Sequence, residues 1–587
     1  MEIAVTEQEL DRRAKILIVI VALLQGIGLY CLHSALEQKL WPINDLTATT
    51  VLATFLLVVP TFFTLSYRSD YPQGRYWLLF FAIAIVYLWL PWYSSQKLSL
   101  SNNMGGQFYL VPLGLLLAFI ILFFLKATLA TSKQSGAWTP SYESLFGYSW
   151  HNFLSFVLAW LFTLIFWLIL VLWGALFKIV DITLFYDTFQ KSWFLYPVLS
   201  LAFAYGVIMF RTKINAVGAV QRILRALISM LLPLLLFIAL MFITVLPFTG
   251  VNLIWDKGYG SDTILGFVGL SLFFFNAVYQ DGKKSPYRPL LNLFCQYSMI
   301  ALIVLLALSA YGMYARVAQY GLTTERILAI ILIAIMFSYL VLYAAIAVFK
   351  RFSWPVSFGN VNTLLALVIS GVIFLLFTPV LDPSRLSVNS QLARLDAGLL
   401  PIEKVDFKFL ARNGKHGKNA LESLKLRNDV KSSADISRRI DSAIKSKGRG
   451  YMTRGELSLK EAKGVIQTYP VNTEFESAIW ALFSEEPYTI NHCFTADCAL
   501  LRIDLNGDSV YEYVLFNNHN TSIHLKFFIR NQQGKLQAQY SPAHLNMSFT
   551  SLLAKLESSS FSLASPQWKN LKIGDETINT PSNALDQ

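Results

Sequence analysis

Eleven apolar runs, separated by polar loops, occupy the first 380 residues of the chain. A helix that crosses a bilayer needs about 20 predominantly apolar residues, so we interpret each run as one membrane span. The predicted spans are residues 16–34, 48–66, 76–93, 108–129, 152–177, 193–210, 226–247, 263–280, 289–315, 327–349 and 361–380. The pattern predicts an α-helical polytopic membrane bundle of about eleven helices.

None of these predicted spans contains an aspartate or a glutamate. Ion-coupled carriers usually keep an ionisable group at mid-membrane, so the pattern disfavours a carboxylate-based proton or sodium relay. Lys126, the only formal charge inside a span, lies near the end of the fourth, and we expect it to reach the headgroups. The main uncharged polar residues, which we expect to hydrogen-bond between helices, are Gln25, Asn276, Asn292, Gln296, Tyr297 and Tyr339.

Composition and charge agree with a membrane protein. The 587 residues are 55% hydrophobic, above the roughly 45–50% of soluble domains. Residues 1–380 hold 23 Lys and Arg against 14 Asp and Glu, so they carry +9 of the net charge of +12. Because these basic residues cluster in short loops between spans, they indicate membrane topology and not nucleic-acid binding.

The distribution of basic residues also predicts an orientation. With the N-terminus in the cytoplasm, inside segments hold 16 Lys and Arg and outside loops hold 7, as the positive-inside rule requires. Eleven spans then place everything after residue 380 outside. We therefore predict a multi-pass membrane protein with a cytoplasmic N-terminus and an extracytoplasmic C-terminal domain.

The composition changes abruptly at Leu381-Asp382-Pro383. We predict a cytoplasmic segment 1–15, a membrane domain 16–380, an extracytoplasmic α+β domain 381–575 and a flexible tail 576–587. Helices are expected in that domain at 387–395, 418–426, 433–445, 458–468 and 474–483, and strands at 499–504, 510–517, 522–530 and 536–540. Asn506-Gly507 predicts a two-residue hairpin turn between the first two strands.

Cys493 and Cys498 are the only cysteines close to one another in the sequence. In an oxidising compartment their spacing favours a local disulfide. The alternatives are free thiols, or a zinc site that would need further ligands such as His492 and His519.

An acidic segment near the middle of the predicted strands imitates the start of a calcium loop. Asp504, Asn506, Asp508 and Glu512 place oxygen atoms at positions 1, 3, 5 and 9. Ser509, however, stands where an EF-hand needs glycine. We favour an acidic hairpin turn, with calcium binding as the alternative.

The loop between the ninth and tenth spans carries our candidate ligand-binding residues, Arg316, Tyr320 and Arg326. A guanidinium group pairs bidentately with phosphate or carboxylate, so these residues are suited to an anionic ligand. The structural alternative is that Gly321 ends one helix and Thr323 caps the next.

The same loop carries a resemblance to a known family. It holds Tyr314, Arg316, the run Gln319-Tyr320-Gly321-Leu322-Thr323, and Arg326, and is followed after the last span by 385–395 and 407–421. Over about residues 280–425 the chain resembles the bacterial polytopic inner-membrane proteins grouped as domain of unknown function 4153. The resemblance implies a location and no reaction: the bacterial inner membrane, which makes the extracytoplasmic domain 381–575 periplasmic. It also suggests that the shared residues serve the helix joint and the docking of the tail. The segment 390–395 has the pattern of an amphipathic helix lying on the outer leaflet.

No Walker A, H-E-x-x-H or G-x-S-x-G motif is present in the sequence, and we assign neither catalytic residues nor a cofactor. Our leading hypothesis is a non-enzymatic envelope protein whose periplasmic domain binds a lipid-linked or protein ligand while the bundle transports or transmits. One rival is an enzyme acting on lipid-linked or glycan substrates at the outer surface, where Asp256, Asp262 and the acidic segment 504–512 join the two arginines as candidates. The other is a structural assembly partner.

Overall fold

The computed structural model forms two compact units, Met1–Gly448 and Arg449–Gln587. It describes residues 10–42, 45–98, 109–250, 260–280, 286–350, 358–431, 433–445, 466–471, 473, 475–485, 493, 498–519, 522–530, 536–545, 547–563, 571–573 and 576–578. Each unit is described by itself below.

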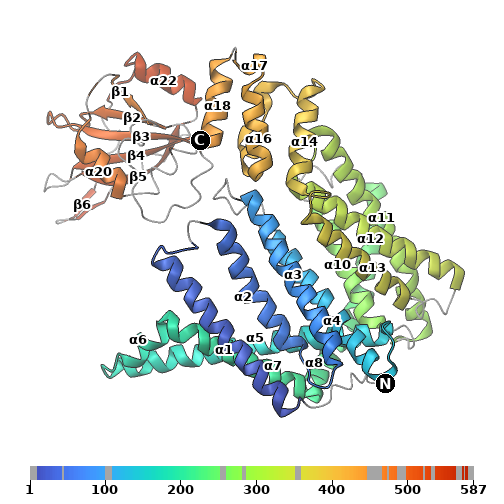
Figure 1. Cartoon of the computed structure of the whole chain (residues 1–587). Helices are drawn as coiled ribbons and strands as arrows, with labels where there is room; N and C mark the ends of the chain where they lie inside the picture. The colour runs from blue at the N-terminus through green and yellow to red at the C-terminus, as the bar shows by residue number, and fades with distance from the viewer. Residues whose placement is uncertain are drawn as a thin grey trace. The chain divides into compact units, whose positions relative to one another are not determined.

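Helices dominate the first unit (Figure 1). The long ones are α1 (Arg12–Glu37), α2 (Leu46–Ser66), α3 (Gln73–Leu98), α4 (Leu110–Ser135), α5 (Tyr142–Ile179), α7 (Ser192–Thr212), α8 (Ile214–Thr249), α10 (Gly260–Tyr279), α11 (Pro289–Tyr320), α12 (Thr324–Lys350) and α13 (Phe358–Leu376). Among the described residues, eleven helices are long and apolar enough to cross a membrane, one for each predicted span. The predicted membrane bundle is confirmed.

Several helices extend beyond the predicted spans and include acidic residues at their ends. Glu37 closes α1, while Glu143, Asp262 and Glu325 lie in the first turns of α5, α10 and α12. A carboxylate near a helix N-terminus interacts favourably with the helix dipole. These acidic residues lie at the ends of their helices, and the apolar centres of the same helices contain no aspartate or glutamate.

Two apolar cores hold the bundle together. One joins α1 to α4 with parts of α5, α7 and α13, and the other joins α8 and α10 to α13. Because α13 contributes Ile373 to the first core and Leu365 to the second, it connects the two groups. Figure 1 shows them as the blue helices α1 to α3 and the green-to-yellow helices α10 to α13.

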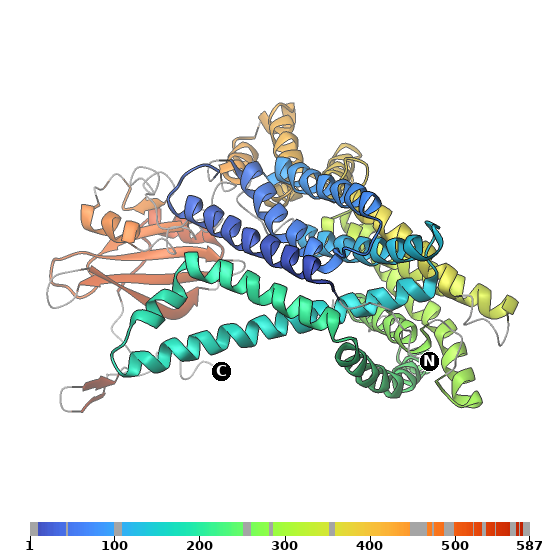
Figure 2. The same cartoon turned by 60° about the horizontal axis from the view of Figure 1, so that its bottom comes forward.

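The long helix α5 and helix α7 form a hairpin through the short helix α6 (Leu184–Gln190). Figure 2 shows this hairpin as the blue-green helices that join at one end. Helix α1 packs closely along α7: a Cβ built on Gly26 would overlap the Cα of Pro197 and lie 2.8 Å from the carbonyl oxygen of Tyr196. Small residues permit such backbone contact between membrane helices.

Among the residues described after the last span, the first unit has five further α-helices: α14 (Pro383–Asp396), α15 (Phe407–Arg412), α16 (Gly414–Lys425), α17 (Asn428–Lys431) and α18 (Ala434–Lys445). The predicted helices at 387–395, 418–426 and 433–445 are confirmed, whereas α15 and α17 were not predicted. Val388 and Leu395 of α14 are buried with Leu421 and Ile440 in a core of these helices' own. This apolar face of α14 therefore contacts protein, where the sequence pattern suggested the outer leaflet.

The second unit contains a five-stranded mixed sheet in the order β1-β2-β3-β4-β5. Its strands are β1 (Gln467–Tyr469), β2 (Cys498–Ile503), β3 (Glu512–His519), β4 (Ser522–Arg530) and β5 (Leu536–Leu545), with β1 parallel to β2 and the others antiparallel. A separate hairpin pairs β6 (Leu571–Ile573) with β7 (Glu576–Ile578). The predicted strands and the α+β class are confirmed.

The two faces of the sheet are covered by different helices. Helix α20 (Ser477–Glu485) packs Trp480 with Tyr513 on one face, and α22 (Phe549–Glu557) packs Leu552 with Val514 on the other. Adjacent residues of β3 thus point to opposite cores, as the period of a strand requires.

One local prediction was wrong. Ile503 pairs with Glu512, so residues 504–511 connect β2 to β3 and replace the predicted two-residue turn. Most of the predicted helix 458–468 lies outside the described residues, and its last two residues belong to strand β1.

The close packing of α1 on α7 predicts that Gly26→Ala destabilises the bundle by about 1–3 kcal/mol, the usual effect of overpacking. Thermal unfolding of the purified protein in lipid nanodiscs measures the change. Gly371→Ala is the matched control, because a Cβ there would meet nothing within 4 Å. Equal midpoints for Gly26→Ala and Gly371→Ala would contradict this packing.

Candidate functional site

The α11–α12 loop turns at a glycine. Gly321 has φ +77°, a left-handed conformation that favours glycine, and its N–H donates to the Val317 carbonyl at 2.8 Å. At the start of α12, Thr323 Oγ1 accepts a hydrogen bond from the Arg326 N–H at 3.4 Å. The helix end and the cap that the sequence suggested are both present.

Side chains of helix α14 donate hydrogen bonds to the carbonyl groups at the C-terminal end of α11. Arg394 donates to the carbonyls of Ala318 at 2.9 Å and Gln319 at 2.7 Å, and Gln391 donates to that of Tyr320 at 3.0 Å. The last four carbonyls of a helix have no partner within it. Side chains 71 to 76 residues later in the chain supply these partners.

Two serines of α14 hold the next residue of the loop. Ser390 Oγ accepts from the Leu322 N–H at 3.1 Å, and Ser387 Oγ donates to the Leu322 carbonyl at 3.3 Å. A Cβ on Gly321 would lie 2.7 Å from Arg394 Cδ and 2.8 Å from Gln391 Nε2, so any other residue there would displace these two side chains. We name Ser387, Ser390, Gln391 and Arg394 the α14 clamp.

A second attachment lies where the chain leaves α13. The side chain of Asp382 is completely buried; its Oδ1 caps α14 by accepting from the Ser384 N–H at 3.1 Å. Its Oδ2 lies 3.2 Å from His416 Nε2 on α16. Thr324 of α12 also donates to Asn413 at 3.3 Å. The helices after the last span are thus bonded to the bundle at several points.

The α14 clamp brings a third arginine to the predicted ligand residues. Arg326 donates to the Gly321 carbonyl at 2.6 Å and lies over the Tyr320 ring, 5.4 Å from its centroid. Arg316 and Arg394 are both close enough to interact electrostatically with Arg326. The tyrosine is more than half exposed. The structure therefore groups Arg326 and Tyr320, and adds Arg394, which the sequence analysis did not select although it lies in the segment of family resemblance.

A polar node lies inside the bundle and consists of Tyr142, Asn276, Tyr343 and Asn362, from α5, α10, α12 and α13. Tyr343 Oη lies 2.8 Å from Asn276 Oδ1 and 2.6 Å from Asn362 Oδ1. Asn362 Nδ2 donates to Asn276 Oδ1 at 2.9 Å and to Tyr142 Oη at 2.7 Å. Only Asn276 was singled out from the sequence; the signal for Asn362 is an amide in the apolar start of the last span.

Other polar residues of the bundle form bonds between helices, as expected. Gln25 donates to the Leu56 carbonyl at 2.9 Å and to Thr61 at 3.0 Å. Tyr279 donates to Asn292 at 2.8 Å.

The expectation for Lys126 was wrong. Its side chain is completely buried, and its Nζ donates to Asn152 Oδ1 at 2.8 Å and lies 5.3 Å from the Tyr148 ring centroid. Both partners are on α5, which covers this part of α4. The lysine is therefore held within the protein and does not extend to the headgroups.

Charged residues at the α2–α3 loop identify one side of the bundle. Asp70 accepts a bidentate pair of bonds from Arg68 at 2.9 and 3.0 Å, and a bond from Lys133 of α4 at 2.8 Å. Desolvation raises the pKa of Asp70, but these bonds outweigh it and lower the pKa to about 2. The α2–α3 loop and the end of α4 thus lie on the same side, as alternating spans require.

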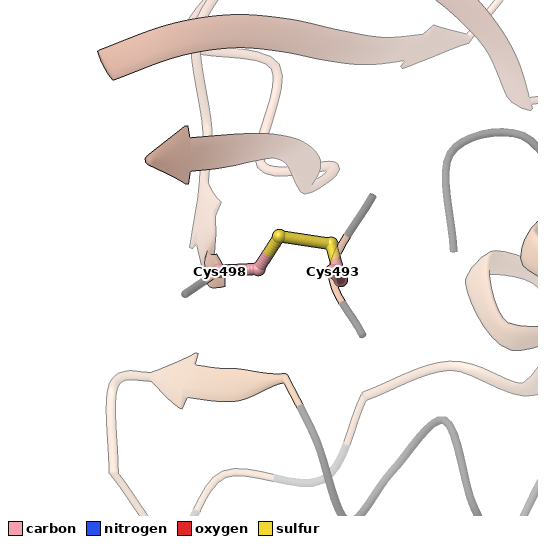
Figure 3. The surroundings of a disulfide bond; sticks show 2 residues. All are labelled: Cys493 and Cys498. Carbon is pink, nitrogen blue, oxygen red and sulfur yellow. A yellow bond between two sulfur atoms is a disulfide. The ribbon is translucent and has the colours of Figure 1, made fainter. Parts of the chain in front are cut away.

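The predicted disulfide between Cys493 and Cys498 is present (Figure 3). Both cysteines are buried in the core beneath α20, together with Tyr513 and Phe528. The bond fixes the segment before β2 to the first residue of that strand.

The carboxylate oxygens of the acidic turn accept hydrogen bonds from backbone N–H groups. Asp504 accepts from the N–H groups of Gly507 at 2.7 Å and Ser509 at 2.9 Å, and Glu512 accepts from that of Leu505 at 2.9 Å. Desolvation raises the pKa of Asp504, but the N–H groups of Ser509 and Gly507 outweigh it and lower the pKa. Asp508 similarly accepts from the Val510 N–H at 2.7 Å. Residues 504–511 thus form a hydrogen-bonded turn between β2 and β3, and calcium binding there stays a prediction.

Comparison with known proteins gives one match. The profile of the family described as Domain of unknown function (DUF4153) matches residues 51–424, from α2 to α16. No curated protein and no solved structure matches the chain.

The α14 clamp predicts that Arg394→Ala loosens the end of α11. The variant removes two donors from the terminal carbonyls, and a loss of about 1–1.5 kcal/mol corresponds to about tenfold faster local opening. Hydrogen exchange of residues 316–322 in nanodiscs measures this opening. Exposed Arg412 on α15 provides the control, Arg412→Ala; unchanged exchange in Arg394→Ala would contradict a clamp.

The disulfide predicts that neither Cys493 nor Cys498 reacts with a thiol reagent in the non-reduced, denatured protein. Cys493→Ser should lower the free energy of unfolding of the second unit by about 2 kcal/mol, the loop-closure value for a short loop. Cys31→Ser, which removes an exposed free thiol, is the control. Labelling of both residues without reductant would show that the bond is absent.

Proposed function

We propose a function that rests on the joint between α14 and the bundle. The chain belongs to the family Domain of unknown function (DUF4153), and this description assigns no activity. In this proposal the protein is a non-enzymatic protein of the bacterial inner membrane. Its periplasmic domain, residues 381–575, binds or senses a ligand, and the helical bundle transports or transmits in response.

The α14 clamp is the observation that carries the proposal. Its side chains bond to backbone carbonyls and one backbone N–H of the α11–α12 loop. Backbone groups cannot turn away from their partners as exposed side chains do. A displacement of α14 must therefore move the end of α11 or break several hydrogen bonds together.

Two observations support the periplasmic assignment. Basic residues favour the side of the bundle that holds the N-terminus. The second unit contains a disulfide, and disulfides persist in oxidising compartments such as the periplasm.

The arginines at the loop support an anionic ligand. Arg316 and Arg394 each interact electrostatically with Arg326, beside the exposed ring of Tyr320. The Glu325 carboxylate offsets part of this repulsion, and a phosphate or carboxylate ligand would add further negative charge. At the outer membrane surface, the group with this chemistry is the headgroup or phosphate of a lipid-linked ligand.

The enzyme hypothesis requires a general acid or base near these arginines. Asp256 lies outside the described residues, and Asp262 lies in the first turn of α10. The assembly hypothesis requires the arginines only for folding. The experiment below separates all three.

Native mass spectrometry of the full chain, extracted into polymer nanodiscs without detergent, tests the ligand. We expect the wild type to retain an anionic lipid-linked molecule intact, and Arg316→Ala to retain about tenfold less, since a charge-assisted hydrogen bond contributes about 1.5–3 kcal/mol. Arg412→Ala should retain the wild-type amount.

Three results would count against the proposal. Absence of any bound anionic molecule from the wild type, or equal retention by Arg316→Ala, would exclude this ligand site. A cleaved product in the wild type that is intact in Arg316→Ala would favour the enzyme. Loss of protein without loss of ligand per molecule would favour the assembly role.

A further inference from the structure

The polar node holds one contact between polar atoms that no hydrogen fills. Four contacts join its members: Asn276 Oδ1 to Asn362 Nδ2 and to Tyr343 Oη, Asn362 Oδ1 to Tyr343 Oη, and Asn362 Nδ2 to Tyr142 Oη. A fifth joins Asn276 Nδ2 to the Leu272 carbonyl at 2.9 Å. A tyrosine hydroxyl has one hydrogen. Tyr343 nevertheless lies within 2.8 Å of two amide oxygens, so one contact joins two oxygens with no hydrogen between them.

Exchanging the oxygen and nitrogen positions of the asparagine amides does not remove this unsatisfied contact. With Asn362 reversed, its nitrogen donates to Tyr343, but its oxygen then lies 2.9 Å from Asn276 Oδ1. Reversing Asn276 as well places its oxygen against the Leu272 carbonyl at 2.9 Å. Reversing Asn276 alone sets two amide nitrogens against each other. Every arrangement leaves one contact unsatisfied.

The oxygens come from three different helices and meet in a partly enclosed position. Tyr343 is almost completely buried, while Asn276 and Asn362 are partly exposed. Phe358 stacks on the Tyr343 ring at 4.2 Å between centroids, and Phe275 lies 6.0 Å from it. Aromatic rings therefore shield the Tyr343 side of the node, while the two asparagines keep partial exposure.

We propose that the node is a binding site for a monovalent metal cation, with Asn276 Oδ1, Asn362 Oδ1 and Tyr343 Oη as ligands. A cation accepts oxygen ligands without needing hydrogens, so it resolves the contact that no arrangement of amides satisfies. Neutral carbonyl oxygens coordinate monovalent cations in channels and transporters. The site does not depend on the proposed anionic ligand at the α14 clamp.

The neutral ligands select the class of ion. Divalent cations in proteins are usually held by carboxylates, and the three proposed ligands carry no charge. The nearby N-termini of α5 and α13 disfavour a cation, but the three oxygens act at contact distance, where their dipoles dominate. An ordered water molecule is the competing occupant, and only a cation makes the site respond to the choice of salt.

Salt-dependent thermal unfolding of the full chain in nanodiscs tests the proposal. Na⁺ or K⁺ chloride is titrated against N-methylglucamine chloride at constant ionic strength. We expect the wild-type midpoint to rise and saturate with one of the metal ions, because a ligand that binds only the folded protein stabilises it. Asn362→Ala and Tyr343→Phe should each weaken the apparent affinity about tenfold or more.

Asn292→Ala is the matched control, since it removes an equivalent tyrosine–asparagine bond outside the node and should keep the salt response. Tyr343→Phe retains the buried ring, so the test does not depend on Asn362→Ala being folded. No metal-ion response in the wild type, or the same response in Tyr343→Phe, would overturn the proposal.

Discussion

Inside a bilayer no water is present to satisfy a polar group, so each one must find its partner within the protein. This constraint explains the polar contacts of the membrane half. Gln25 bonds to a carbonyl of α2, Lys126 to Asn152, and buried Arg211 to the carbonyls of Thr64 at 2.7 Å and Tyr67 at 3.0 Å. Each bond joins helices that the apolar cores alone would allow to slide, and so helps to fix their register.

The same requirement shapes the edge of the bundle. Helix α11 ends with open carbonyls, and α14 satisfies them with side chains that arrive from beyond the last span. Only residues 377–382 separate α13 from α14, and Asp382 among them is buried against His416. The soluble helices therefore continue the membrane bundle directly. This continuity is the physical basis for proposing that the two parts act together.

The sequence was sufficient for the spans because hydropathy is a local property that needs no knowledge of neighbours. It was also sufficient for β4, whose predicted and observed bounds coincide. The sequence did not predict contacts between a side chain and a distant segment of the chain. Arg394 bonds to a residue 76 positions away, and Asn362 to one 220 positions away. The lysine on α4 was misplaced for the same reason, since its surroundings depend on how α5 packs.

The central claim is that the loop bound by the α14 clamp lies on the outer side of the membrane. Single cysteines at two exposed positions outside the predicted spans, Gln319→Cys and Ser135→Cys, can be placed in a chain with Cys31 and Cys295 replaced by alanine. A membrane-impermeant maleimide is then applied to intact spheroplasts. The account predicts that position 319 is labelled at once and position 135 only after permeabilisation; the reverse pattern would contradict it.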